Sequence, residues 1–371
     1  MTADSKQAAR RRVLMTIDAV GGVWRYAMDL ASGLRKKGID TVFAGFGPKP
    51  SSMQAQEAQA VGKLVWCDAP LDWMVEAEAD LERAPQIIGD LARNERVDLV
   101  HLNLPSQAVE LTLDIPVVVV SHSCVATWFK AVRGCAVPDP WRWQVRRNRE
   151  GFANADVVLS PSYSHAALLR EVYGSVRGIK IVYNSSRVPE GTSVKKNIVF
   201  AAGRWWDEGK NGATLDAAAA LVDWPVVAVG AAEGPNGQRL TFGHARLRGE
   251  LAHADSMALM AEAAIVVSPS LYEPFGLAAL EGARGRSALV LADIPTYREL
   301  WEGAALFADP RDPHAFAEAI NRLSRDESLR NTLAAHAHAR SMKFTTEAQV
   351  KSVAHVYGQL LPTNVSLTAA E

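Results

Sequence analysis

The chain has 371 residues, of which 48% are hydrophobic, and this length favours two domains that each have their own core. Its formal net charge of −1 gives no electrostatic reason to expect a nucleic-acid partner. The 3 cysteines are scattered without a Cys-x-x-Cys motif, so we expect no disulfide framework and no zinc site. The longest apolar runs are too short to span a bilayer, and no apolar signal core follows the polar start. We therefore expect a soluble cytoplasmic protein, or one bound peripherally at the inner face of the membrane.

Strand-like and helical patterns alternate through the first half of the chain. Residues 13–17 read as a strand, Gly21 and Gly22 as a turn, and residues 23–37 as an amphipathic helix. Further strand-like runs follow at 41–46, 63–66, 97–102, 116–122 and 156–160. Alternation of this kind predicts an α/β fold with a parallel sheet covered by helices on both faces.

Gly21 and Gly22 occupy the first strand-to-helix turn. They suit a tight turn in any doubly wound fold, and their missing Cβ atoms would also let a phosphate or sugar approach the backbone. The Gly-x-Gly-x-x-Gly pattern is absent, so a dinucleotide oxidoreductase is not supported.

His122 closes the predicted strand 116–122, and the carboxyl end of a strand is where α/β sheets bind ligands. A lone histidine in such a place is also commonly structural. The stretch 128–149 that follows mixes cations and aromatic rings. Three interpretations of it stay open: a surface helix whose tryptophans pack inward, part of an acceptor pocket, or a patch that docks on an anionic membrane.

The second half begins after a linker-like stretch, residues 185–196, which is rich in Ser, Pro, Gly and Lys. A strand at 197–203 leads into Arg204 and Lys210, which flank a turn before a helix at about 211–221. Two cations beside the free N–H groups of a helix start make an anion site. The alternative is a surface turn with local ion pairs to Asp207 and Glu208.

Residues 263–267 form another apolar strand, and Pro274 and Gly276 mark a turn into a helix that carries Glu281. Glu273 and Glu281 would be about 12 Å apart if the segment between them were helical. The two catalytic carboxylates of a retaining glycosidase lie about 5 Å apart. The larger spacing of Glu273 and Glu281 instead suits an elongated ligand that is held at both ends. A capped helix with two solvated glutamates is the simpler alternative.

At this point the sequence resembles a known family. Glu273-Pro-Phe-Gly with Glu281 resembles the Glu-x7-Glu motif of retaining GT-B glycosyltransferases, in particular glycosyltransferase family 4. The loop at Gly21-Gly22 resembles that family's first glycine loop, and Arg204 with Lys210 resembles its Gly-Arg…Lys motif. The resemblance extends from residue 13 to about 361.

The resemblance implies two Rossmann-like domains facing across a cleft, with a C-terminal helix that crosses back to the first domain. We place the acceptor-side domain at 1–188, with 345–371 returning to it, and the nucleotide-sugar domain at 189–344. The implied reaction is retaining, metal-independent sugar transfer from a nucleotide diphosphate sugar, without a cofactor, to a glycan, lipid-linked or small-molecule acceptor hydroxyl. No Asp-x-Asp triplet occurs, so the motif through which enzymes of the GT-A fold usually bind a metal ion and the diphosphate is absent.

The resemblance also assigns roles. Arg204 and Lys210 bind the diphosphate, Glu281 the ribose, and Glu273 and His122 the sugar. The remaining donor-binding candidates surround the two turns: Gly21, Gly22, Phe275, Gly276 and Leu277. We expect Trp205 and Trp206 to narrow the donor cleft. An inactive nucleotide-sugar-binding protein, or a nucleotide-sugar epimerase or phosphorylase-like enzyme on the same fold, is the alternative function.

Overall fold

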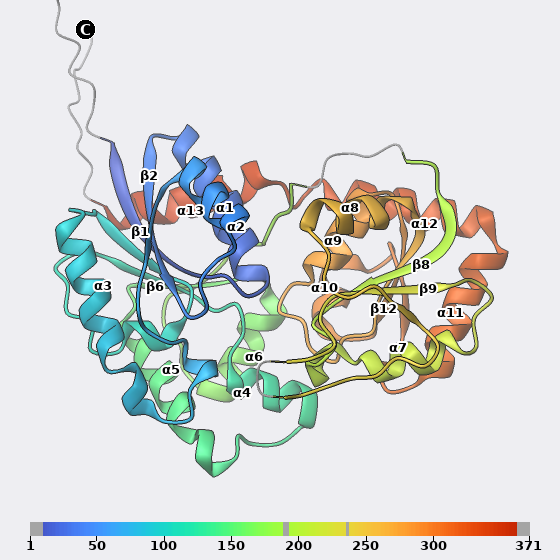
Figure 1. Cartoon of the computed structure of the whole chain (residues 1–371). Helices are drawn as coiled ribbons and strands as arrows, with labels where there is room; N and C mark the ends of the chain where they lie inside the picture. The colour runs from blue at the N-terminus through green and yellow to red at the C-terminus, as the bar shows by residue number, and fades with distance from the viewer. Residues whose placement is uncertain (1–9, 188–192, 235–236, 362–371) are drawn as a thin grey trace, which may run out of the picture.

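The computed structural model describes residues 10–187, 193–234 and 237–361, which form two lobes (Figure 1). The first domain is built on a sheet with the strand order β3-β2-β1-β4-β5-β6-β7, in which neighbouring strands run parallel. Its strands are β1 Arg11–Asp18, β2 Ile39–Phe46, β3 Lys63–Trp66, β4 Leu99–Leu102, β5 Val117–Val120, β6 Val157–Ser160 and β7 Ile179–Ile181.

The second domain repeats this architecture. Its sheet has the order β10-β9-β8-β11-β12-β13, again with parallel neighbours. The strands are β8 Lys196–Ala202, β9 Val226–Val229, β10 Arg246–Leu247, β11 Ala263–Ser268, β12 Ala288–Ala292 and β13 Leu306–Ala308. Central strands such as β11 and β12 are buried along their whole length, which explains their unbroken apolar sequence.

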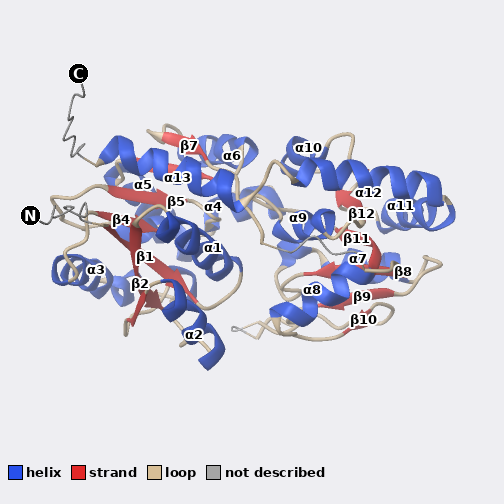
Figure 2. Ribbon diagram, turned by 90° about the horizontal axis from the view of Figure 1, so that it is seen from above, coloured by secondary structure: helices blue, strands red, loops and turns tan. Residues whose placement is uncertain are grey.

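Helices connect the strands and cover both faces of each sheet (Figure 2). Those of the first domain are α1 Gly22–Lys36, α2 Ser52–Val61, α3 Arg83–Asn94, α4 Val125–Trp128, a π-helix Phe129–Arg133, α5 Arg142–Asn154 and α6 Tyr163–Tyr173. Those of the second are α7 Gly212–Ala219, α8 His253–Glu262, α9 Leu277–Arg284, α10 Pro295–Trp301, α11 Pro313–Arg325 and α12 Glu327–Ser341. Across the described residues, no helix combines the length and the apolar character that crossing a bilayer requires.

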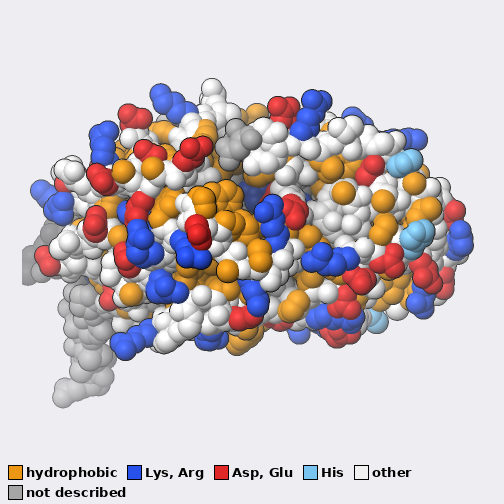
Figure 3. Space-filling model, turned by 90° about the horizontal axis from the view of Figure 1, so that it is seen from below, with side chains coloured by type: hydrophobic (Ala, Val, Ile, Leu, Met, Phe, Trp, Pro, Cys, Tyr) orange, Lys and Arg blue, Asp and Glu red, His pale blue; other side chains and the backbone are white. Residues whose placement is uncertain are grey.

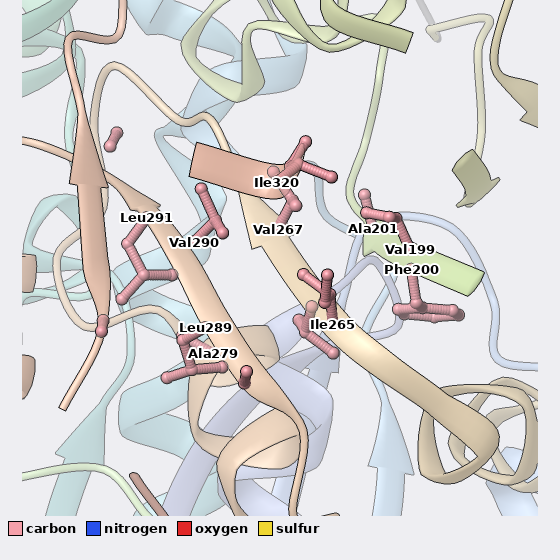
Figure 4. Close-up of a cluster of buried hydrophobic side chains, with 14 of the residues drawn as sticks. Val199, Phe200, Ala201, Ile265, Val267, Ala279, Leu289, Val290, Leu291 and Ile320 are labelled. Atoms are coloured by element: carbon pink, nitrogen blue, oxygen red, sulfur yellow. The ribbon is translucent and has the colours of Figure 1, made fainter. Parts of the chain in front are cut away.

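Each domain has its own hydrophobic core. In the second domain, side chains from β8, β11 and β12 meet α9 and α11, and Phe200, Ile265 and Ile320 lie among them with no exposed surface (Figure 4). In the first domain, separate clusters occupy the two sides of the sheet, with Met15 on one side and Leu14 on the other. Alternate residues of a strand point to opposite faces, so one apolar strand supplies both clusters.

The last helix, α13 Thr346–Leu360, lies on the first domain although it follows α12 of the second (Figures 1 and 2). It packs against α1, where a Cβ on Gly33 would lie 2.3 Å from Val350, so only glycine allows this close approach. The Tyr357 hydroxyl and His101 Nδ1 are 2.7 Å apart in the interior. Burial lowers the pKa of His101 to about 3, so it is neutral.

The predicted GT-B fold, with its returning helix, is therefore confirmed. The boundary predicted at 188/189 and the tail from residue 362 lie outside the described residues, as does the middle of the predicted linker. The predicted strands 97–102, 116–122 and 156–160 were longer than β4, β5 and β6. β5 ends at Val120, so His122 follows the strand in a loop and does not close it.

Candidate functional site

Loops at the carboxyl ends of the two sheets meet between the domains, in a region that we call the junction. The Tyr272 hydroxyl, from the loop after β11, is 2.8 Å from Thr127 Oγ1 in α4. The hydroxyl of Ser162 donates to the Pro274 carbonyl across 2.7 Å. Because ligands of open α/β sheets bind beyond the carboxyl ends of the strands, the junction is the candidate site.

The two glycines of the first turn face the second domain. A Cβ on Gly21 would lie 3.8 Å from Nη1 of Arg204, and a Cβ on Gly22 would lie 3.7 Å from Cδ1 of Leu277. Gly21 also has φ +95°, a conformation that favours glycine. The structure thus brings the glycine turn beside residues that the sequence assigned to the donor site, from the opposite domain.

Arg204 and Lys210 lie on the loop after β8, as the sequence indicated. The guanidinium of Arg204 is 3.3 Å from Asp207 Oδ2, and its side chain retains 44% exposure. Arg204 also lies 5.4 Å above the ring of Trp206. The local ion pair with Asp207 therefore exists, and the partly exposed guanidinium is at the junction as well.

Lys210 is joined to Glu273, which comes from the loop after β11. Its Nζ is 2.5 Å from Oε1 of Glu273, and the two side chains are only 21% and 13% exposed. The same carboxylate oxygen accepts a hydrogen bond from Ser270 at 3.1 Å. Parallel strands β8 and β11 are neighbours in the sheet, which is why two residues so distant in sequence meet.

Gly276 starts α9 without a side-chain cap, leaving the first N–H groups of the helix available to an anion. It has φ +88°, and a Cβ there would lie 2.5 Å from Cε1 of Tyr297. Phe275, by contrast, points into the core of the second domain, where its ring packs on Phe344. A donor contact from Phe275 would have to come from its backbone.

Glu281 is buried, with 8% of its surface exposed, and Ser186 Oγ is 3.5 Å from its Oε1. Burial raises the pKa of Glu281 to about 7, with a further contribution from the negative charge of Asp29 on α1. The alternative of two solvated glutamates is therefore wrong for both Glu273 and Glu281, since each is largely enclosed.

His122 has a defined hydrogen-bonding state. Asn103 donates through Nδ2 to the Thr16 carbonyl, so its Oδ1 is an acceptor, and that atom is 2.7 Å from His122 Nε2. His122 must therefore carry its proton on Nε2, which leaves Nδ1 as an acceptor. Burial lowers the pKa of His122 to about 4, so the ring is neutral near pH 7.

Asp18 is a site residue that the sequence patterns did not single out. It ends β1, is 4% exposed, and accepts a hydrogen bond from the Val20 amide at 2.8 Å. Burial raises the pKa of Asp18 to about 6, while the charge of Arg204 acts in the opposite direction. The signal was present: an acidic residue stands at the carboxyl end of the first strand, just before the glycine turn.

Trp205 does not narrow the junction, contrary to our expectation. It is 3% exposed, packs edge-on against Phe242, and donates from Nε1 to the Val229 carbonyl at 3.0 Å. A large ring with one donor is stable in the core when that donor is satisfied. Trp206 alone lies beside Arg204.

The cations of 128–149 are mostly paired. Ion pairs join Lys130 to Glu171, Arg133 to Glu208, Arg142 to Asp139 and Arg146 to Glu78. Trp128 is turned toward the second domain, where its Nε1 donates to Asp207 at 2.9 Å. Trp141 is 47% exposed, so the tryptophans of this stretch do not all pack inward.

Comparison with solved structures places the fold among glycosyltransferases. A sucrose-phosphate synthase from Thermosynechococcus elongatus superposes with a TM-score of 0.78 at 18% identity, over 95% of this chain and 99% of that one. HepE of Anabaena, in complex with UDP and glucose, superposes with a TM-score of 0.75 at 17% identity, over 94% and 100% of the two chains.

Curated relatives are matched over shorter segments. O-antigen chain mannosyltransferase B of Escherichia coli is 27% identical over 173 residues, 47% of this chain and 39% of that protein. A D-inositol 3-phosphate glycosyltransferase of Salinispora arenicola is 33% identical over 109 residues, 28% of this chain and 24% of that protein. The chain thus spans less than half the length of these relatives.

Family patterns cover most of the chain. The pattern of Glycosyltransferase Family 4 matches residues 20–185, and that of Glycosyl transferases group 1 matches residues 186–340. These segments contain the glycine turn, the loop with Arg204 and Lys210, and both glutamates. The chain belongs to the family 4, group 1 glycosyltransferases.

Proposed function

We propose that the protein transfers a sugar from a nucleotide diphosphate sugar to an acceptor hydroxyl, with retention of the anomeric configuration and without a metal ion. The observation that carries this proposal is the placement of Arg204 and Lys210 at the junction, opposite Gly21 and beside Glu273. Family membership supports the reaction class and the retention of configuration.

The chemistry follows from charge. As the bond between sugar and diphosphate breaks, negative charge grows on the leaving phosphate. Arg204, Lys210 and the uncapped N–H groups at the start of α9 are donors fixed in advance, and such donors stabilise developing charge strongly in a partly dry site. Two cations in this place supply the charge compensation that a metal ion supplies elsewhere.

Glu273 is a poor covalent nucleophile because its Oε1 already accepts from Lys210 and Ser270. This engagement favours departure and attack on the same face of the sugar, with Glu273 holding sugar hydroxyls. The neutral His122 would accept a hydrogen bond from a sugar hydroxyl at Nδ1, since its Nε2–H already donates to Asn103. Glu281 would accept hydrogen bonds from the ribose hydroxyls.

The named relatives suggest which donors to test first. HepE was crystallised with UDP-glucose, and the E. coli relative is a mannosyltransferase. UDP-glucose and nucleotide-linked mannose therefore lead the donor panel. The acceptor remains a choice among glycan, lipid-linked and small-molecule hydroxyls, and the assay must offer all three.

A thermal-shift screen against nucleotide sugars tests donor binding, because a tight ligand stabilises the folded state. A donor that shifts the melting temperature is then incubated with and without acceptors, and free nucleotide diphosphate is measured. Release that depends on acceptor supports a transferase. Binding without any release would mean an inactive binding protein, and a changed sugar still attached to its nucleotide would mean an epimerase.

We also propose that the underside of the first domain contacts an anionic membrane surface. Figure 3 shows this side, with hydrophobic side chains near its middle and Lys and Arg among them. A hollow of about 550 Å³ there is lined by Val137 and Val145, by Lys130, Arg142 and Arg149, and by Glu171, which pairs with Lys130; Trp141 is exposed nearby. Flotation with anionic vesicles should recover the protein, and neutral vesicles should not; equal recovery would contradict the proposal.

A further inference from the structure

A hydrogen-bonded chain runs from the first domain to the donor-site arginine of the second. The indole Nε1 of Trp128, the last residue of α4, donates to Oδ1 of Asp207 at 2.9 Å. The other oxygen of that carboxylate, Oδ2, accepts from Arg204 at 3.3 Å. One carboxylate therefore links a residue of one domain to the guanidinium that faces the donor site in the other.

Asp207 also organises the turn that carries both cations. Its amide donates to the Arg204 carbonyl at 2.9 Å, and its carbonyl accepts from the Lys210 amide at 2.8 Å. Its Oδ1 accepts a second hydrogen bond, from the Gly209 amide at 2.9 Å. The side chain is only 13% exposed, so the carboxylate has little freedom to rotate while these bonds are made.

The fit around this carboxylate is tight. A Cβ on Gly209 would lie 2.9 Å from Nε1 of Trp128 and 3.1 Å from Oδ1 of Asp207, so any larger residue would push the indole away. The π-helix that follows Trp128 places Arg133 5.2 Å from the indole ring. Arg133 in turn bonds Glu208 at 2.8 Å and 3.0 Å, so adjacent acids of the turn are both held by the first domain.

We propose that Trp128 and Asp207 are positioning residues that couple the approach of the two domains to the orientation of Arg204. With the domains together, the indole fixes the carboxylate of Asp207, and Oδ2 then directs the guanidinium toward the junction. With the domains apart, Oδ1 keeps only its bond from the Gly209 amide, so the carboxylate that orients Arg204 is held less firmly. This proposal rests on the proposed function, because it assigns Arg204 to the donor diphosphate.

The kinetic test uses Trp128→Phe, which removes the N–H and keeps a ring, and Asp207→Asn, which keeps the shape and removes the charge. Each should lower kcat at least 10-fold and change the donor KM less than 3-fold, because the orientation of Arg204 matters most in the transition state. The double variant should be no slower than the slower single variant, since both act through one chain of contacts.

The matched control is Glu208→Gln, the neighbouring acid, whose ion pair also crosses the junction but does not touch Arg204. It should change kcat less than 3-fold. An equal loss in Glu208→Gln, or additive losses in the double variant, would overturn the proposal, because the contacts would then serve only general cohesion of the domains.

A second measurement does not depend on activity. In protein labelled with 5-fluorotryptophan, the ¹⁹F resonance that disappears in the Trp128→Phe variant is the resonance of Trp128. That resonance should move further in Asp207→Asn than in Glu208→Gln, which acts on the indole only through Arg133; an unmoved resonance in Asp207→Asn would overturn the contact itself. If the wild type transfers sugar from no donor, the proposed function fails. If it transfers and Trp128→Phe keeps more than a third of kcat, the coupling alone fails.

Discussion

Lys210 and Glu273, 63 positions apart in the chain, form a largely enclosed ion pair in which Nζ lies 2.5 Å from Oε1. The pair joins the loops that follow the neighbouring strands β8 and β11. A cation that is already placed and partly desolvated needs little reorganisation when a phosphate takes up charge beside it. Lys210 is therefore the residue at which the proposed electrostatic mechanism can be tested most directly.

Replacing Lys210 by Ala should lower turnover about 10²–10³-fold, the usual effect of removing one preorganised donor. The free energy of unfolding should fall by only about 1–3 kcal/mol, because Glu273 keeps its bond to Ser270. Initial rates and urea denaturation measure the two effects. The control is Lys196→Ala, which removes a lysine paired to Glu262 at 2.7 Å in a more exposed place. Near-normal transfer in Lys210→Ala would remove Lys210 from the mechanism.

Replacing Glu281 by Ala should weaken nucleotide binding while the fold stays intact. At pH 8, above the pKa of Glu281, hydrogen bonds to its charged carboxylate contribute about 1.5–3 kcal/mol net, which corresponds to roughly 10- to 100-fold in affinity. Titration calorimetry with the nucleotide diphosphate measures the loss. Glu262→Ala, on the surface of α8, should bind like the wild type. Unchanged affinity in Glu281→Ala would count against the ribose role.

The pH dependence of stability should also report on Glu281. Its pKa rises from 4.5 to about 7 in the folded protein, so the folded state binds the proton more tightly than the unfolded state. The resulting stabilisation is complete below about pH 4.5 and is lost as pH rises through 7. It is on the order of 3 kcal/mol, at about 1.4 kcal/mol for each pKa unit.

Urea denaturation from pH 5 to pH 8 tests this linkage. The wild type should lose stability relative to Glu281→Gln across that interval, because the glutamine variant has no proton to release at this position. Other buried acids, such as Asp18, contribute equally to both proteins and cancel in the difference. Parallel profiles would mean that Glu281 is already ionised in the folded protein at pH 5.

The sequence predicted the fold well because periodicity and chain order encode it. Strands that are buried on both sides have unbroken apolar runs, and parallel order places the loops after β1, β8 and β11 at facing edges. Chain order placed these residues in loops after strands, and the resemblance to glycosyltransferase family 4 indicated that Gly21, Arg204, Lys210 and Glu273 share one region. They could not fix strand ends, which is why His122 lies beyond β5.

Contacts between distant side chains were not predictable in the same way. Nothing local indicates that Trp205 turns into the core while Trp206 stays beside Arg204, because a tryptophan in a turn can pack in either direction. The contact between Trp128 and Asp207 spans 79 positions and depends on how the domains are placed. Buried acids such as Asp18 acquire their pKa from the surrounding fold, which sequence patterns do not describe.

Gly276 should tolerate no side chain. Alanine there must adopt φ +88° and would place its Cβ 2.5 Å from Cε1 of Tyr297, whose hydroxyl lies 2.5 Å from Ser268 Oγ in the interior. Backbone strain and the clash together should cost about 2–5 kcal/mol of unfolding free energy. Gly303→Ala is the matched control, because Gly303 has φ +76° and an added Cβ there would meet no atom within 4 Å, so it should cost only about 1–2 kcal/mol. Urea denaturation of both variants separates clash from strain, and equal losses would mean that Tyr297 moves aside freely.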